Sequence, residues 1–324
     1  MNRLIMGSIL RNFSVKNLGE VGLADLEDGA SISFGDKEIV VSTDSYIVTP
    51  IFFPGGDIGK LAVCGTINDI SMLGACPIAL SLAIVVEEGF ETSDLEHIIR
   101  SINEVCQSNK VHVITGDAKV MEKGKLDRII INTTGIGIAE SGKLIKNTNL
   151  SKGDKIIISG TVGDHGISLM SFREGFGFET TLQSDVAPLW NMVEKILRVG
   201  GITAMRDPTR GGLATALNDF ARKSNKGIVI YENQIPLKSE VEAASRMLGI
   251  DPYTVASEGK AVMGVRSDKA EEVLAVLQST EEGKDASIIG EVIEEYPGKV
   301  ILETEVGGKR IMQPPVGDPI PRVC

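Results

Sequence analysis

The amino-acid sequence predicts a mixed α/β protein of the α+β class that is divided into two domains. First, its 324 residues exceed the roughly 150 that are typical of one domain. Second, strand-like apolar runs alternate with helical patterns in both halves of the chain. Third, a polar, turn-rich segment at Glu140–Asp154 separates the two halves. We expect domains at 1–147 and 148–313, followed by a flexible proline-rich tail at 314–324.

The first half contains the clearest periodic elements. Residues rich in β-branched side chains predict strands at Ile39–Tyr46, Ala79–Val86, Val111–Thr115 and Arg128–Ile138. The apolar run 60–74 predicts a buried helix. A second helix is expected from residue 93 onward, where Ser93 and Glu96 form a capping box and apolar residues then recur every three to four positions. The first residues of the chain, MNRLIMGSILRNF, also read as the opening turns of a helix.

The second half repeats the mixture of strands and helices. Helical patterns occupy residues 185–199, 211–224, 237–248 and 268–279. Strand-like runs occur at Lys155–Ser159, Gly227–Tyr231, Lys260–Val265, Ser287–Val292 and Val300–Glu305.

The composition excludes several classes of protein. A net charge of −11 argues against a general nucleic-acid or membrane-surface binder, because both need a basic field. No apolar run reaches the ~18 residues of a membrane-spanning helix. Three histidines and scattered cysteines form no zinc-ligand pattern. We expect Cys64, Cys76 and Cys106 to be small buried side chains in the reducing cytoplasm.

Five aspartates stand at expected strand ends or in glycine-rich turns, and they are candidates for a metal site. They are Asp28, Asp44, Asp69, Asp117 and Asp207. Carboxylates that converge in one cleft would bind Mg²⁺, which prefers oxygen ligands and often bridges carboxylates to nucleotide phosphates. Asp beside Gly also marks ordinary solvated turns. Asp69 favours function most, because it lies inside an apolar helix where a buried carboxylate needs a partner.

Glycine-rich turns are candidates for phosphate binding, because free backbone N–H groups can cradle an anion. Three segments fit: 52–60 with Gly55 and Gly56, 159–166 with His165, and 207–213. Arg210 and Lys119 are possible phosphate partners, and both also read as surface cations. No P-loop or protein-kinase motif accompanies these turns, each of which alone is equally typical of a structural turn.

The chain ends in PPVGDPIPRVC, so its last residue, Cys324, stands at the end of a proline-stiffened arm. At ~3.1 Å per residue, the arm could reach about 34 Å. A terminal cysteine can be an accident of where the chain stops. It can also be a mobile thiol that carries a covalent group between two sites, because a thiolate is an effective nucleophile. We favour the carrier.

Several motifs together resemble one known family. They are STDSYIVTPIFFPGGDIGKLAVCGTINDISMLGACPIALSLAIVVEEGF, VITGDAKV, INTTGIG, SGTVGDHG, RDPTRGGL, SEGK and the terminal PRVC. The chain resembles the HypE family of hydrogenase-maturation proteins, within the superfamily of aminoimidazole ribonucleotide synthetase, selenophosphate synthetase and thiamine-monophosphate kinase. The resemblance covers nearly the whole chain.

The resemblance implies a fold, an activity and partners. The fold would be the two-domain aminoimidazole ribonucleotide synthetase-like fold, in which the N-terminal strands of two copies form a dimeric barrel. The family receives a carbamoyl group on its C-terminal cysteine from the carbamoyltransferase HypF. It dehydrates that group to a thiocyanate with ATP and passes the cyano group to a HypC–HypD scaffold, which builds the Fe(CN)₂CO centre of [NiFe]-hydrogenase.

The resemblance also implies roles for particular residues. Cys324 would be the carrier thiol, and the five aspartates would match the superfamily's metal ligands. Asp44, Asp69 and Asp117, with Gly55, Gly56, Arg210 and His165, would contact the nucleotide. Because dehydration of an amide needs a good leaving group and a base, Glu258 of SEGK is the expected base, and Lys119 would stabilise the transferring phosphoryl group. For His165, a structural role is an equal alternative.

Two departures from the family pattern bear on ATP binding. The superfamily normally has a short G-x-G-G segment before the helix that opens here at Met1, and the sequence lacks it. Many members have TGDTKV, where this chain has Ala118 in place of the threonine. Two alternatives therefore stay open beside the dehydratase: a non-catalytic thiol carrier or adapter, and a sister kinase or synthetase that acts on a free small molecule.

Overall fold

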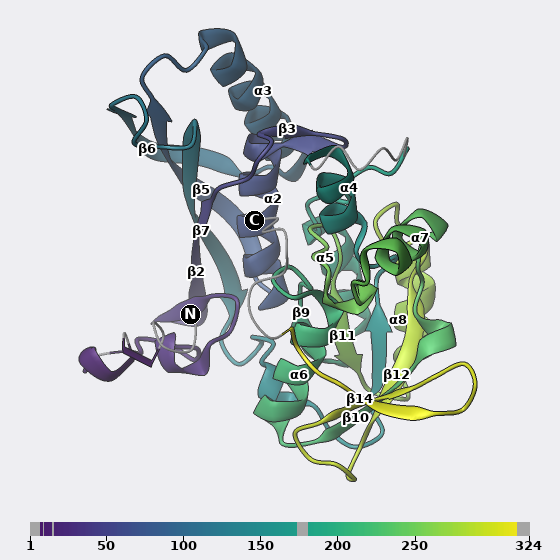
Figure 1. Cartoon of the computed structure of the whole chain (residues 1–324). Helices are drawn as coiled ribbons and strands as arrows, with labels where there is room; N and C mark the ends of the chain where they lie inside the picture. Colours follow the sequence, from purple (N-terminus) through teal and green to yellow (C-terminus); the bar gives the residue numbers. More distant parts are fainter. Residues whose placement is uncertain (1–6, 9, 15, 174–180, 316–324) are drawn as a thin grey trace.

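A computed structural model describes residues 7–8, 10–14, 16–173 and 181–315 (Figure 1). The chain folds around two β-sheets of mixed strand direction, each with helices packed against it. The predicted mixed class is therefore confirmed. Residues 7, 8 and 10–12 are helical, while the rest of the expected first helix lies largely outside the described residues.

The first sheet has five strands in the order β1-β2-β7-β5-β6. They are β1 (Ala30–Phe34), β2 (Lys37–Tyr46), β5 (Cys76–Glu87), β6 (His112–Met121) and β7 (Ile129–Glu140). All neighbours are antiparallel except β5 and β6. A parallel pair needs a crossover, and the helix α3 (Thr92–Asn109) supplies it. A two-residue hairpin, β3 (Phe52–Phe53) and β4 (Gly56–Asp57), precedes the helix α2.

Helix α2 (Ile58–Met72) forms the centre of the molecule. Its apolar composition leaves almost every residue buried, because it packs against the first sheet, against α3 and against α5 of the second half. Asp57 is the N-cap residue of this helix, and its carboxylate accepts hydrogen bonds from the backbone N–H groups of Gly59 (2.7 Å) and Lys60 (3.1 Å). Such an N-cap stabilises a helix by about 1 kcal/mol.

Helix α3 is amphipathic, as its spacing of apolar residues predicts. Ile98, Ile102 and Val105 are buried in the core beneath the first sheet. The predicted capping box is wrong in its position, because the helix begins at Thr92 with Glu91 as its N-cap, and no side chain caps it. Ser93 therefore lies inside the first turn.

The second sheet has seven strands in the order β14-β13-β10-β12-β8-β11-β9. They are β8 (Lys155–Ile158), β9 (Ile202–Arg206), β10 (Gly227–Tyr231), β11 (Val262–Val265), β12 (Ser287–Ile293), β13 (Val300–Glu303) and β14 (Lys309–Met312). Its helices are α4 (Asp164–Arg173), α5 (Trp190–Val199), α6 (Gly212–Ser224), α7 (Ser239–Leu248) and α8 (Ala270–Gln278). Helix α6 contributes to one apolar core of this half, whereas α5 and α8 contribute to another.

The structure differs from the sequence-based expectation at several elements. β1, β9, β14 and α4 were not expected, and β6 runs on to Met121. TGDAKV is therefore the middle of a strand and not a turn, which corrects the setting expected for Asp117. The helix expected at 185–199 begins only at Trp190, because Pro188 disfavours helical geometry at the residue before it. The two sheets lie on either side of 141–154, but the division at 147/148 stays a prediction.

One face of the first sheet is not covered by a helix among the described residues. Along β2, Ser42 and Tyr46 contact α2, so the alternate residues Thr43 and Ser45 point to the opposite face. That face carries exposed apolar side chains, including Ile32 (40% exposed) and Phe34 (73% exposed) of β1. No described helix is long and apolar enough to cross a membrane.

Candidate active site

A cleft lies between the first sheet with its helix α2 and two loops of the second half. Its lining is mostly polar and contains four carboxyl groups. The lining residues are Asp44, Ser45, Tyr46 and Ile47 at the end of β2, Gly65 and Asp69 of α2, Asp207, Thr209 and Arg210 after β9, and Glu258 before β11. Five predicted site residues, drawn from four separate segments, therefore meet in one place: Asp44, Asp69, Asp207, Arg210 and Glu258.

Strand periodicity and helix packing bring Asp44 and Asp69 together. Alternate residues of β2 face α2, so Ser42, Asp44 and Tyr46 share the inner face. The hydroxyl of Ser42 donates to Oδ2 of Asp69 at 2.5 Å. Tyr46 packs over Gly65, where an added Cβ would lie 2.2 Å from the tyrosine oxygen. The glycine therefore lets the aromatic ring approach the helix.

The carboxylates of the cleft repel one another. Burial raises the pKa of Asp69 well above its usual range, and the charges of Asp207, Asp44 and Asp28 raise it further. Burial, followed by the charge of Asp28, raises the pKa of Asp207 to about 8, although Arg206 partly offsets this. Such strongly perturbed groups in a cleft are typical of functional sites. A cation bound here would relieve the repulsion.

Two arginines partly neutralise this charge. Arg206, the last residue of β9, lies 3.3 Å from Oδ1 of Asp28 and 3.1 Å from Oδ2 of Asp219. It therefore ties the segment before β1 to helix α6. Arg210 lies at the rim, with its guanidinium 3.7 Å from Oδ1 of Asp44 and most of its side chain exposed. An exposed arginine beside a cleft can contact an incoming phosphate bidentately.

The donors fit a hard cation only in part. All the acidic ligands are carboxylate oxygens, which suit Mg²⁺. Among the described residues, however, no three His, Cys, Asp or Glu side chains are close enough to hold one ion together. Mg²⁺ commonly takes one or two carboxylates and completes its shell with water and substrate phosphates. The cleft is therefore suited to a metal that arrives with a phosphate ligand.

Glu258 reaches the cleft from a loop between the short helix η4 (Pro252–Thr254) and β11. The residue is only 5% exposed. Its neighbour Ser257 donates its backbone N–H to the carbonyl of Pro208 at 3.1 Å, which joins this loop to the Asp207 loop. The two segments that supply Glu258 and Asp207 are therefore held side by side.

Asp117 and Lys119 do not line this cleft. They lie on β6, where Lys119 Nζ is 2.9 Å from the Asp117 carboxylate and both side chains are mostly exposed. The Lys119 side chain donates a hydrogen bond that lowers the pKa of Asp117. The strand register places Asp117 in a row with Ser45, on the sheet face opposite to Asp44. Within one chain, the predicted set of five metal ligands is not assembled.

The glycines and the histidine expected to contact phosphate have packing roles in the fold. Gly55 has a φ of +94°, and a Cβ there would lie 2.7 Å from the carbonyl oxygen of Ser184. A Cβ on Gly56 would lie 2.9 Å from Val186. His165 is fully buried, contacts Ser184 Oγ through Nδ1 at 2.7 Å, and has its pKa lowered to about 3 by burial. These contacts favour the structural alternative for His165.

The cysteines differ in their surroundings. Cys64 and Cys106 are buried, as expected. The expectation for Cys76 is wrong, because it opens β5 and is exposed. Cys324 lies outside the described residues. The described part of the tail ends at Pro315, which approaches Gly211, so that a Cβ on that glycine would lie 3.2 Å from Pro315 Cγ. The described part of the chain therefore ends next to Arg210 of the cleft.

Several polar residues around the cleft were missed by sequence reasoning, including Ser45 and Thr209 of its lining. Tyr46 lines it, Arg206 binds Asp28, and Asn68 and Asp185 contact the backbone of Glu258. Asn68 carried the same signal as its neighbour Asp69, namely a polar side chain inside an apolar helix. Asp185 carried no local signal, because its loop reads as helical when Pro188 is ignored.

Comparisons with known proteins define the class. Residues 26–139 match the N-terminal domain of the AIR synthase related proteins, and residues 151–303 match their C-terminal domain. The first sheet falls within residues 30–140, and the cleft lies where it meets the loops of the C-terminal half. The chain is thus a two-domain protein with the AIR synthase related fold.

Full-length relatives narrow the class. The chain is 51% identical, over 100% of its length and 96% of the relative's, to a putative hydrogenase expression/formation protein of Methanocaldococcus jannaschii. It is 42% identical to the carbamoyl dehydratase HypE of Bradyrhizobium diazoefficiens, covering 98% of this chain and 93% of that one. The chain belongs to the HypE family of hydrogenase-maturation proteins.

Solved structures agree with this assignment. A HypE in a crystallised HypE–HypF complex superposes with a TM-score of 0.90 at 45% identity, covering 96% of this chain and 99% of the other. A HypE crystallised in complex with ATP gives a TM-score of 0.86 at 40% identity, covering 100% of this chain and 96% of the other.

Proposed function

We propose that the chain dehydrates an S-carbamoyl group on its own Cys324 to a thiocyanate at the expense of ATP. One observation carries the proposal: Pro315, the last described residue, lies beside Gly211, and the adjacent Arg210 lines the carboxylate cleft. Nine further residues lead to Cys324, and a chain of that length spans at most about 30 Å. The segment that carries the thiol is therefore long enough for the thiol to enter the cleft.

The chemistry proceeds in two balanced steps. The carbamoyl oxygen attacks the γ-phosphorus of ATP while one N–H proton leaves. This step yields an O-phosphorylated imidate, S–C(=NH)–O–phosphate, and ADP. A base then removes the remaining N–H proton while the C–O bond breaks, and inorganic phosphate departs to leave S–C≡N. Phosphorylation is needed because hydroxide is a poor leaving group. Two observations on relatives support this reaction: one is named a carbamoyl dehydratase, and another was crystallised in complex with ATP.

We assign the base to Glu258, the only one of the cleft's four carboxyl residues that is not an aspartate of the proposed metal set. One or two of the aspartates Asp44, Asp69 and Asp207 would bind Mg²⁺, and the nucleotide phosphates and water would complete its shell. When bound, the ion would neutralise charge on the transferring phosphoryl group. Arg210 at the rim would contact the phosphates.

We also propose that the chain forms a homodimer through the open face of its first sheet, as the dimeric barrel of the family would require. The exposed apolar side chains Ile32, Phe34 and Ile138 lie on that face. Lys119 and Asp117 lie on the same face. In the proposed dimer, their side chains would therefore contact the second copy of the chain. In this proposal, Lys119 acts on the phosphoryl group in the partner's cleft.

The proposed partners follow from the chemistry of the thiol. HypF would supply the carbamoyl group, and a relative crystallised in a HypE–HypF complex supports HypF as a partner. A HypC–HypD complex would accept the cyano group. A carrier thiol must stay reduced between these encounters, which favours the cytoplasm. For the domains we keep the proposed bounds of 1–147 and 148–313.

Intact-protein mass spectrometry tests the reaction. After incubation with HypF, carbamoyl phosphate and ATP, the chain should first gain one carbamoyl group and then lose one water. Cys324→Ala should show neither change. If Cys324→Ala shows both, the proposed function is wrong.

Titration of the chain with Mg²⁺ and ATP separates this function from the adapter, which would bind neither. A tail-deleted chain that kept full ATP-dependent activity on a free small molecule would instead support the sister kinase.

A further inference from the structure

Glu258 lies in a loop, so no strand or helix fixes its backbone. A loop residue that acts as a base still needs a defined position, because the rate of proton transfer depends on geometry. In this structure both polar groups of the Glu258 backbone are bound by side chains from distant segments. Asn68 of α2 contacts its carbonyl oxygen, and Asp185 of the loop before α5 contacts its N–H.

Asn68 makes its hydrogen bonds outside its own helix. Its Nδ2 group donates to the carbonyl oxygens of Glu258 (3.3 Å) and Ala187 (3.0 Å), and its Oδ1 accepts from the backbone N–H of Leu189 (2.8 Å). The residue is 1% exposed. By contrast, Asn218, which is also in a helix and buried, donates to the carbonyl four residues before it, the usual local bond.

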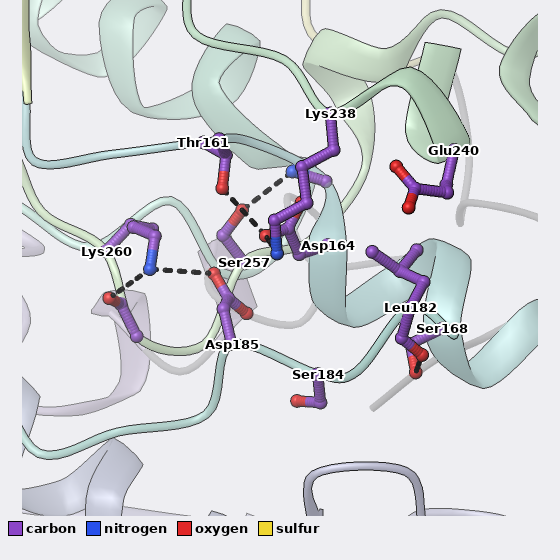
Figure 2. Close-up of polar contacts among 12 residues, drawn as sticks. Thr161, Asp164, Ser168, Leu182, Ser184, Asp185, Lys238, Glu240, Ser257 and Lys260 are labelled. Carbon is purple, nitrogen blue, oxygen red and sulfur yellow. Dashed lines mark hydrogen bonds and ion pairs between the residues drawn. The ribbon is translucent and has the colours of Figure 1, made fainter. Parts of the chain in front are cut away.

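Asp185 holds the other side of the same residue. Its Oδ1 accepts the Glu258 N–H at 3.0 Å. Its Oδ2 lies 3.8 Å from Nζ of Lys260, two residues after Glu258, and Figure 2 shows this contact. Both charged side chains are largely buried. A Cβ on Gly259 would lie 1.9 Å from the carbonyl oxygen of Asp185, so only glycine lets the two loops approach this closely.

We propose that Asn68 and Asp185 are positioning residues for Glu258, and that together they hold its carboxyl group at the cleft. The inference rests on the proposed function, because it takes Glu258 as the base. We call Asn68 and Asp185 the two clamps of Glu258. Asn68 belongs to the half of the chain that carries the first sheet, and Asp185 belongs to the half that carries the second. Packing of the two halves against each other therefore places the base beside the aspartates of α2 and β2.

Losing either clamp leaves one backbone group of Glu258 without its partner and allows the loop to shift. A displacement of about 1 Å at a reacting group can reduce a rate about 100-fold. We therefore expect Asn68→Ala and Asp185→Ala to slow dehydration by about 10- to 100-fold. ATP affinity should stay within about twofold, because neither side chain lines the cleft.

The test measures single-turnover dehydration of the carbamoylated full-length chain from pH 6 to 9, ATP affinity by calorimetry, and melting temperature. Asp185→Asn keeps an oxygen that can accept the Glu258 N–H, so it should restore most of the rate that Asp185→Ala loses. Asn218→Ala is the matched control, because Asn218 is also a buried helical asparagine and bonds the carbonyl oxygens of Ala214 and Met312, not that of Glu258. It should lower the melting temperature and leave the rate unchanged.

The proposal is overturned if Asn68→Ala and Asp185→Ala dehydrate at the wild-type rate, or if Asn218→Ala loses as much rate as they do. It is also overturned if Asp185→Asn is as slow as Asp185→Ala. Where Asn68→Ala does not fold, the Asp185 pair decides. Glu258→Gln in the same assay separates a failure of the assigned base from a failure of the positioning. Dehydration at the wild-type rate by Glu258→Gln refutes the assigned base. If Glu258→Gln does not dehydrate while Asn68→Ala and Asp185→Ala keep the wild-type rate, only the positioning is refuted.

Discussion

Neutralising Asp207 should stabilise the ligand-free chain while it damages metal binding. Asp207 is 6% exposed, and the pKa of its carboxyl group is raised from 3.8 to about 8 by burial and by the charge of Asp28. An acid with a raised pKa keeps its proton at pH values where the unfolded chain has lost it. The free energy of unfolding therefore falls as the pH rises from about 4 to about 8.

The magnitude follows from that difference. At 1.36 kcal/mol per pH unit, the interval from 3.8 to about 8 gives a ceiling of about 6 kcal/mol at high pH. The repulsion is shared with Asp28 and Asp44, and Asp207→Asn also loses its attraction to Arg206 and Arg210. We therefore expect Asp207→Asn to stabilise the chain by about 2–3 kcal/mol at pH 8.5, which raises the melting temperature of a chain of this length by about 3–5 °C. At pH 6 the gain should be smaller.

The assay is thermal and urea denaturation of wild type and Asp207→Asn at pH 6 and pH 8.5, first without and then with Mg²⁺ and ATP. Only the wild type should gain stability from the ligands. Asp154→Asn is the matched control, because Asp154 is equally buried but accepts hydrogen bonds from Ser151 N and Thr203 Oγ1. If Asp207→Asn destabilises the chain equally at both pH values, the repulsion argument is wrong and ion pairs hold that carboxylate.

Three other predictions concern the cleft and the open sheet face. Asp69→Asn should weaken Mg²⁺-dependent ATP binding at least tenfold in calorimetry, and unchanged affinity would make Asp69 structural. Gly65→Ala places a Cβ 2.2 Å from the Tyr46 oxygen, so it should cost about 1–3 kcal/mol in urea denaturation and lower ATP affinity. A neutral effect would show that Tyr46 can move aside. Phe34→Asp should shift the proposed dimer to monomer in light scattering, while retained dimer would exclude this face.

Much of the fold could be predicted from local pattern. The helix α3 and the strands β2, β5 and β10 follow from apolar periodicity and β-branched content, and the structure confirms each within a few residues. Short strands such as β9 and β14 were missed because four or five residues carry too little pattern. The start of α5 was misplaced because a helical apolar pattern extends back over residues 185–189, where Pro188 excludes the helix.

The candidate site could be predicted only in part, for a physical reason. The sequence pattern predicted Asp69 as a site residue, because a carboxylate inside an apolar helix needs a partner. Lys119 and Asp117 share the TGDAKV motif, for which the family resemblance implied metal and phosphate contacts, but strand parity turns them away from Asp44. Gly55 and Gly56 suggested phosphate binding, whereas their positions are explained by the close approach of residues 184–186.

The sequence by itself determined membership of a family and which residues are candidates for chemistry: the acidic residues in their motifs, the glutamate of SEGK and the terminal cysteine. Only the tertiary structure decided which of them meet. The reason is that a residue type and its neighbours set what a side chain can do, while its partners are set by contacts between segments far apart in the chain. Asn68 and Glu258 lie 190 positions apart, and a hydrogen bond of 3.3 Å joins them.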